Sequence, residues 1–135
     1  MFTHLNRTIV NEFATVDEFR AAFDEKTQSG TRFITIFEGT INEANKRSWC
    51  PDCVLAKPHI DRIIDASDGQ LAFIKANVTR KEWGGNSAHP YRFPPFGATG
   101  VPTMTLYEGT NQLYKVDNLQ VFADNSAMDK FLEKV

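Results

Sequence analysis

The two cysteines of the chain, Cys50 and Cys53, are separated by two residues, and this pair constrains the fold more than any other feature. A secreted domain held together by disulfides carries more cysteines, spaced to close large loops. A disulfide between Cys50 and Cys53 closes a short ring and contributes about 2 kcal/mol at most in the loop-closure model. We therefore interpret the pair as a chemical site rather than as a structural cross-link.

The residues on either side of the pair predict a buried strand before it and a helix after it. The run FITIF at 33–37 is continuous and β-favouring, as in a strand covered on both faces. Apolar residues at helical spacing follow Cys53, and the helix is expected to end before Asp68. A cysteine at a helix N-terminus faces unpaired N–H groups and the positive end of the dipole, which favour the thiolate. Pro51 suits the first turn, where no N–H partner is needed.

The spacing of the two cysteines predicts a definite chemistry. It lets the second sulfur reach the first, so that Cys50 can attack a disulfide and Cys53 can then displace the product.

The remaining elements follow from hydrophobic spacing and turn residues. Thr15 and Glu18 predict a capped helix that ends near 29–30. Residues 103–107 and 112–116 flank a turn and predict a hairpin. Further strands are expected at 8–10 and 71–78, and a last helix is expected from Ser126. The order βαβαβ, a long irregular stretch and ββα predicts a single α/β domain over residues 1–135, with parallel and antiparallel strands in one sheet.

Two segments interrupt this regular pattern. A polar stretch covers 39–48, and a stretch rich in glycine and proline covers 79–100. The second contains aromatic residues that are able to pack, among them Trp83 and Tyr91. A connection of this length is either a structural cover for the sheet or part of the site, and the sequence leaves both interpretations open.

Composition and charge exclude several classes of protein. Apolar residues make up 41% and charged residues 24% of the chain, which excludes wholesale disorder. Fifteen Lys and Arg oppose seventeen Asp and Glu, so no basic field is present to bind nucleic acid or a membrane surface. The apolar runs are far shorter than the ~18 residues that span a bilayer, and the first seven residues, MFTHLNR, lack the apolar segment of a secretory signal. We expect a cytoplasmic protein.

The motif WCPDC at 49–53, placed between a strand and a helix, resembles the active site of thioredoxins. Pro58 falls where thioredoxins have a proline in the active-site helix, and GVPT at 100–103 resembles their cis-proline segment. Four further features narrow this resemblance to one family: the Pro-Asp pair inside the motif, the serine before it, the longer preceding loop and Trp83. Together they resemble the family of the 14 kDa thioredoxin-related protein, also called the thioredoxin domain-containing protein 17 family.

This resemblance covers roughly residues 10–135 and implies a thioredoxin fold, with a mixed central sheet flanked by helices on both faces. It also implies a monomeric cytosolic disulfide reductase that binds no cofactor of its own. Reducing equivalents come from NADPH through thioredoxin reductase as the partner. The implied substrates are small disulfides such as cystine, together with selected oxidised protein thiols.

By matching positions, the resemblance makes Cys50 the nucleophile and Cys53 the resolving thiol. Val101 precedes the implied cis-Pro102 and offers its backbone to an extended substrate. The residues alone leave a trans bond at Pro102 open. Trp49 is expected to cover the disulfide edge and one flank of the substrate, with packing alone as the alternative.

The chain also departs from thioredoxin near the site. Thr35 stands near the place of thioredoxin's buried aspartate, so we expect no buried acid in this strand. The proton acceptor for Cys53 must then be another group, such as Asp52 or water. Asp52, like Pro51 and Trp49, is expected to tune the site. A carboxylate at a helix N-terminus is favourable by ~0.3–1 kcal/mol, but its charge should raise the pKa of Cys50. A capping role alone is the alternative.

Other chemistries fit the sequence less well. Structural zinc takes four N or S ligands, whereas this chain has two cysteines and three scattered histidines, so no metal is expected. A thiol peroxidase needs a peroxide-activating environment, and no such motif is evident. The rival hypothesis is a redox-sensing protein-binding module whose cysteine pair switches a partner contact without turnover. Its contact sites would be loops 39–48 and 79–98.

Overall fold

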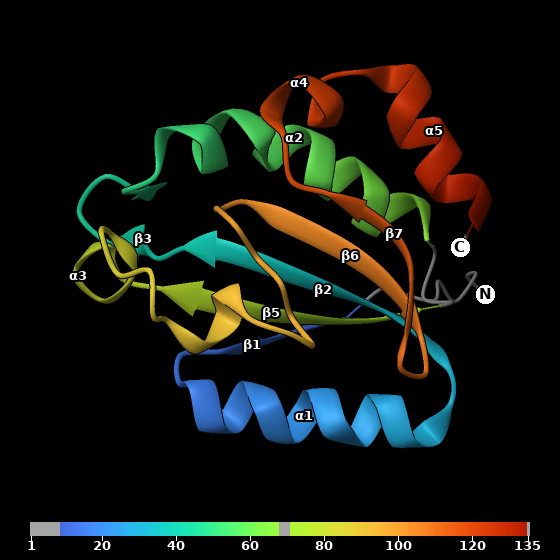
Figure 1. Ribbon diagram of the computed structural model, residues 1–135. Coiled ribbons are helices and arrows are strands. Elements are labelled where there is room, and N and C mark those ends of the chain that lie inside the picture. The colour runs from blue at the N-terminus through green and yellow to red at the C-terminus, as the bar shows by residue number, and fades with distance from the viewer. Residues whose placement is uncertain (1–8, 68–70, 135) are drawn as a thin grey trace, which may run out of the picture.

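Helices cover both faces of a five-stranded sheet in the computed structural model, which describes residues 9–67 and 71–134 (Figure 1). The strand order is β1-β5-β2-β6-β7. The parallel pairs are β1 with β5 and β5 with β2, whereas β6 is antiparallel to both β2 and β7. The predicted mixed sheet is therefore confirmed. The strands are β1 (Val10–Phe13), β2 (Arg32–Gly39), β5 (Ala72–Val78), β6 (Thr103–Glu108) and β7 (Asn111–Val116).

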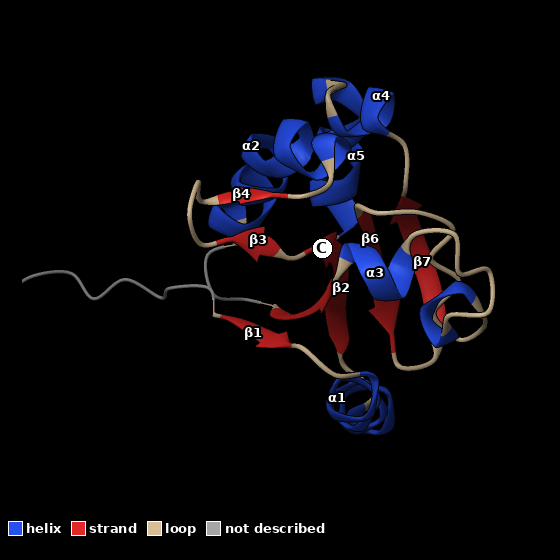
Figure 2. Cartoon of the chain, turned by 90° about the vertical axis from the view of Figure 1, so that its left-hand side faces the viewer, coloured by secondary structure: helices blue, strands red, loops and turns tan. Residues whose placement is uncertain are grey.

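The helices divide between the two faces of this sheet, as the views from two sides show (Figures 1 and 2). Helix α1 (Val16–Ser29) packs on one face, and α2 (Pro51–Ala66) packs on the other. The short helix α4 (Leu119–Phe122) and the C-terminal helix α5 (Asn125–Lys134) join α2 on its face. Within the described ranges, no helix combines the length and the apolar character needed to span a bilayer.

Helix α1 begins and ends where its sequence predicts. The Thr15 hydroxyl accepts a hydrogen bond from the backbone N–H of Glu18 at 3.3 Å and donates one to the Glu18 carboxylate at 2.8 Å. The helix ends at Gly30, whose φ of 71° is left-handed and is adopted most easily by glycine.

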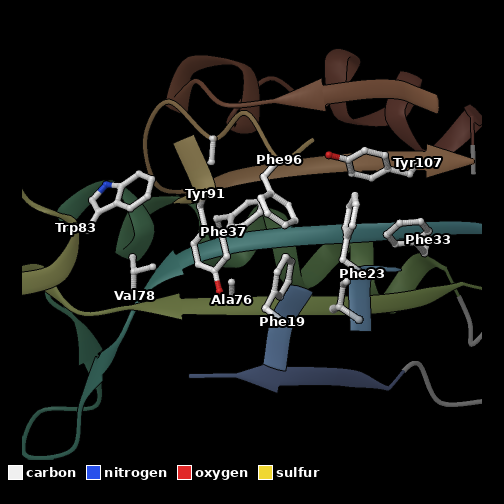
Figure 3. Close-up of a cluster of buried hydrophobic side chains, with 12 residues drawn as sticks. Phe19, Phe23, Phe33, Phe37, Ala76, Val78, Trp83, Tyr91, Phe96 and Tyr107 are labelled. Carbon is white, nitrogen blue, oxygen red and sulfur yellow. The ribbon is translucent and has the colours of Figure 1, made fainter. Parts of the chain in front are cut away.

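The core on the α1 face is built largely of aromatic rings (Figure 3). Phe23 of α1 and Phe96 of the glycine- and proline-rich segment lie 4.9 Å apart between ring centroids. Tyr91, from the same segment, lies 4.9 Å from Phe37 of β2. Edge-to-face and tilted ring pairs of this kind add about 0.5–1.5 kcal/mol each beyond the burial of their area. Segment 79–100 is therefore a structural cover for the sheet, the first of its two interpretations.

One arginine organises this segment from within. The segment contains α3 (Arg80–Trp83) and a 3₁₀ turn, Pro90–Arg92. The Arg92 guanidinium donates hydrogen bonds to the carbonyl oxygens of Trp83, Asn86 and Thr99 at 2.8 to 2.9 Å. Its central carbon also lies 3.7 Å from the centroid of the Trp83 ring. The irregular connection is thus tied together immediately before the turn that contains Val101.

The structure corrects three details of the predicted elements. The first strand runs from Val10 to Phe13 rather than over 8–10, and Thr8 lies outside the described residues. The polar stretch 39–48 contains a small hairpin of β3 (Ile41–Asn42) and β4 (Arg47–Ser48). Helix α4 was not predicted, because its four residues are too few to show a helical spacing of apolar residues. The helix after the cysteines ends at Ala66, and Asp68 is not described.

Candidate active site

Cys50 is the N-cap of helix α2, as its position before Pro51 predicts. Its Sγ accepts the backbone N–H of Cys53 at 3.3 Å, and Pro51 occupies the first turn. Both cysteines are free thiols, and they are 5% and 2% exposed, respectively. The structure therefore brings the two predicted thiols together at the positive end of a helix.

The two thiols have different acidities. Mainly because the Cys53 thiol donates a hydrogen bond to Cys50, the pKa of Cys50 is lowered to about 7, against the effect of burial. The backbone N–H groups of Cys53 and Asp52 lower it further. Conversely, the same hydrogen bond raises the pKa of Cys53, and burial adds to this rise. Near neutral pH Cys50 therefore forms its thiolate more readily than an ordinary cysteine, while Cys53 keeps its proton.

A buried acid lies on the far side of Cys53, which corrects the expectation of an acid-free strand. Strand β2 continues two residues past Phe37, and Glu38 is only 7% exposed. Its carboxylate lies 3.4 Å from the Lys75 ammonium of β5. Alternation along the strand places Thr35 on the α1 face and Glu38 on the α2 face, toward Cys53. The sequence does contain a signal for Glu38. Side chains alternate along a strand, so the residue two positions after Ile36 lies on the same face as Ile34 and Ile36.

The predicted substrate-binding turn lies directly beside Cys50. The peptide bond between Val101 and Pro102 is cis, which confirms the implied geometry. Cys50 Sγ lies 3.4 Å from the carbonyl oxygen of Val101, which accepts a hydrogen bond from the thiol form. A second cis bond, Pro94–Pro95, was not predicted.

Trp49 is held against the end of strand β2. Its Nε1 donates a hydrogen bond to the carbonyl oxygen of Val78 at 2.9 Å. A Cβ on Gly39 would lie 2.7 Å from the indole ring, so only glycine leaves room for this placement. Trp49 is therefore packed on one side, and it also lines an open groove of about 430 Å³ together with Pro51, the residue after Cys50. The groove is lined by Asn45, Arg47, Ser48, Trp49, Pro51, Val54 and Leu55.

Asp52 is exposed in the first turn of α2, and its charge raises the pKa of Cys50 as expected, while its backbone N–H has an opposite effect that was not predicted. The N-cap of the helix is Cys50 rather than Asp52, so the interpretation of Asp52 as only a cap is wrong.

Replacing Asp52 by Asn is expected to lower the pKa of Cys50 below its value of about 7, because the repulsive charge is removed while the backbone N–H stays. The ultraviolet absorbance of the thiolate follows the titration. Alkylation at pH values below 7 should become faster in the variant than in the wild type. Asp61→Asn, on the same helix but paired with Lys57, is the control. An unchanged or higher Cys50 pKa in Asp52→Asn contradicts this prediction.

The two histidines that the structure describes take no part in a metal site. His89 is buried, and its Nδ1 accepts the backbone N–H of Tyr91 at 3.2 Å. His59 lies on helix α2, and His4 is outside the described residues. Within the ranges 9–67 and 71–134, no group of three His, Cys, Asp or Glu side chains is placed to hold a metal ion.

Comparisons with known proteins agree with this arrangement. The family described as "Thioredoxin domain-containing protein 17-like, thioredoxin domain" matches residues 12–133. The thioredoxin-like protein Clot of Oryza sativa subsp. japonica is 33% identical over 111 residues, which are 75% of this chain and 80% of that protein. Thioredoxin domain-containing protein 17 of Homo sapiens is 28% identical over 104 residues, covering 77% and 81%.

Solved structures show the same fold at low sequence identity. Thioredoxin O2 from Arabidopsis thaliana, in its oxidised state, superposes with a TM-score of 0.61 at 16% identity, and the match covers 98% of each chain. Thioredoxin NaTrxh from Nicotiana alata gives 0.59 at 18% identity, covering 98% and 97%. The thioredoxin fold that the sequence predicts is therefore confirmed.

Proposed function

Because the chain belongs to the thioredoxin domain-containing protein 17-like family, we propose that it reduces disulfides by using Cys50 and Cys53 in turn. The thioredoxin-like domain and the adjacent cysteines make it a thiol oxidoreductase in the general sense. The use of Cys50 as nucleophile and Cys53 as resolving thiol is supported above all by their different acidities: the pKa of Cys50 is lowered to about 7, and that of Cys53 is raised.

The reaction proceeds in two exchanges. The Cys50 thiolate attacks one sulfur of the substrate disulfide, that S–S bond breaks, and one half of the substrate leaves as a thiol after taking up a proton. Cys53 then loses its proton and attacks the Cys50 sulfur, which releases the second half. Two electrons have passed to the substrate, and the protein is left with a Cys50–Cys53 disulfide.

Substrate is held by the turn at Val101 and by the groove beside Trp49. The carbonyl oxygen of Val101 lies within 3.4 Å of the nucleophile, so an extended substrate at this turn places its disulfide next to Cys50. The groove of about 430 Å³ is at the small end of ligand sites. Its size supports small disulfides such as cystine, and single extended loops of oxidised proteins, as substrates.

We also propose an oligomeric state, a compartment and an electron donor for this reaction. The protein acts as a monomer in the cytoplasm, where reductases keep thiols in the dithiol form. It binds no cofactor and is returned to the dithiol by thioredoxin reductase, which supplies electrons from NADPH. The family resemblance supports these points.

Consumption of NADPH by catalytic amounts of the protein, with thioredoxin reductase and excess cystine, tests the proposal. Wild type is expected to turn over many times, and Cys50→Ser is expected to fall to the rate of the reductase alone. A parallel assay with glutathione and its reductase tests the electron donor. Oxidation of one dithiol per protein without turnover in either assay supports the sensor module instead.

A further inference from the structure

The groove beside Trp49 contains one charged residue among the described residues of its lining, Arg47 of strand β4. The other lining residues are apolar or polar without charge. Arg47 is exposed, and within the described part of the chain no side chain or carbonyl oxygen pairs with its guanidinium. The charge of Arg47 is therefore available to a substrate that enters the groove.

Two lysines of the same region are already paired. Lys46, next to Arg47 in the hairpin, lies 2.9 Å from the carboxylate of Glu43. Lys57 of helix α2 lies 2.9 Å from the carboxylate of Asp61. An anion in this groove would therefore find Arg47 unpaired, whereas these two ammonium groups already have carboxylate partners.

Backbone contacts fix the position of Arg47 relative to Cys50. The backbone N–H of Arg47 donates a hydrogen bond to Asn45 Oδ1 at 3.0 Å. The next residue, Ser48, accepts the backbone N–H of Cys50 at 3.1 Å and donates to the carbonyl oxygen of Gly39 at 3.0 Å. Strand β4 also packs against helix α2 (Figure 2). The guanidinium is thus carried on a backbone that is tied to the nucleophile.

We propose that Arg47 binds a carboxylate of the substrate, so that the protein selects disulfides that carry a carboxylate close to the sulfur. This inference rests on the proposed disulfide reduction. A guanidinium presents two parallel N–H donors to a carboxylate, which gives a strong and directional contact. Cystine carries a carboxylate two carbon atoms from each sulfur. Disulfides that carry ammonium groups alone are repelled by the same charge.

A positive charge beside a thiol is also able to act by lowering the pKa of that thiol. The groups that shift the pKa of Cys50 most are Cys53 and Asp52, together with burial. An effect of Arg47 on the acidity of Cys50 would change the attack on every disulfide alike. An effect through contact with the substrate depends on the charge of the disulfide, and three disulfides of different charge separate the two.

A single-turnover reaction of reduced protein with excess disulfide provides the measurement. Samples are quenched with acid, and the loss of two hydrogens from the protein is followed by mass spectrometry at an ionic strength of about 0.15 M. The probes are cystine, cystamine and hydroxyethyl disulfide. Cystamine is cystine without its two carboxylates, and hydroxyethyl disulfide carries no charge.

Replacing Arg47 by Gln should lower the second-order rate constant for cystine about fivefold, which is the upper part of the range for an exposed ion pair. The constant for cystamine should rise, because a repulsive charge is removed. The loss with cystine should lie in the concentration that gives half the limiting rate rather than in the limiting rate itself.

Two further variants separate the guanidinium from charge in general. Arg47→Lys keeps the charge but loses the planar pair of donors, so it should recover part of the preference for cystine. Lys46→Gln removes the same charge from the neighbouring position. It should change the ratio of the cystine and cystamine constants by less than about twofold, because Lys46 already pairs with Glu43.

An unchanged ratio in Arg47→Gln, an equal loss with all three disulfides, or the same change in Lys46→Gln overturns the proposal. Reduction of hydroxyethyl disulfide by the wild type tests disulfide reduction without any charge on the substrate. If the wild type reduces it and Arg47→Gln keeps the wild-type ratio, the role of Arg47 fails alone. If the wild type reduces none of the three, the proposed function fails, and this inference fails with it.

Discussion

Cys53→Ser is expected to stop the reaction after its first half and to hold the substrate on Cys50 as a mixed disulfide. The variant keeps the helix N-terminus and the backbone N–H that donates to Cys50 Sγ at 3.3 Å. Its serine hydroxyl replaces the Cys53 thiol as the hydrogen-bond donor to Cys50 Sγ, so the first attack by Cys50 is retained. Without a second thiol, no group displaces the product, and turnover falls to background.

The trapped species is measured by intact-protein mass spectrometry after treatment with cystine. One cysteine adduct is expected, mapped to the peptide that contains Cys50 and removed by dithiothreitol. The matched variant Cys50→Ser should carry no adduct, because the buried Cys53 keeps its proton. Wild-type turnover by Cys53→Ser contradicts the two-thiol route and indicates that an external thiol resolves the intermediate.

Arg92→Met is expected to lower the free energy of unfolding by about 3 kcal/mol, since hydrogen bonds to charged donors contribute ~1.5–3 kcal/mol each and the contributions are not additive. Three carbonyl oxygens lose their donor, and the contact with the Trp83 ring, worth ~0.5–2 kcal/mol, loses its charge. Because Thr99 lies just before Val101, cystine reduction should fall as well.

Urea unfolding measures the stability change. Arg92→Lys should recover only part of the loss, because a single ammonium cannot reproduce the planar fork that binds three carbonyls. The control is Arg80→Met, an exposed arginine of the same segment, which should change stability by less than about 0.5 kcal/mol. An Arg92→Met protein as stable as this control contradicts the role given to Arg92.

The features that local chemistry determines could be predicted from the sequence. Thr15 caps α1 because its hydroxyl meets a nearby backbone N–H, and Gly30 ends the helix because it tolerates a positive φ. The placement of Cys50 at a helix N-terminus follows from Pro51 and the apolar spacing after it. The cis bond at Pro102 followed from family resemblance, since the residues themselves allow either isomer.

The features that depend on distant partners could not be predicted in the same way. In the sequence, Glu38 is the first polar residue after a predicted strand, whereas in the fold the Lys75 ammonium on the neighbouring strand offsets the cost of its burial. In the sequence, Arg92 is a charged residue of a loop, and its three carbonyl partners are brought together only by the fold. Strand β1 alternates little in hydrophobicity, and its register is set by pairing with β5.

The use of Cys50 and Cys53 as one redox couple is tested most directly by the mass of the reduced wild-type protein, followed with time after reaction with one equivalent of cystine. Reaction through Cys50 and then Cys53 predicts that the protein loses two hydrogens, gains no adduct and releases two cysteines. The loss should reverse with a dithiol reductant. A stable cysteine adduct on the wild-type protein, or no reaction at all, contradicts the claim that the pair works as one two-electron couple.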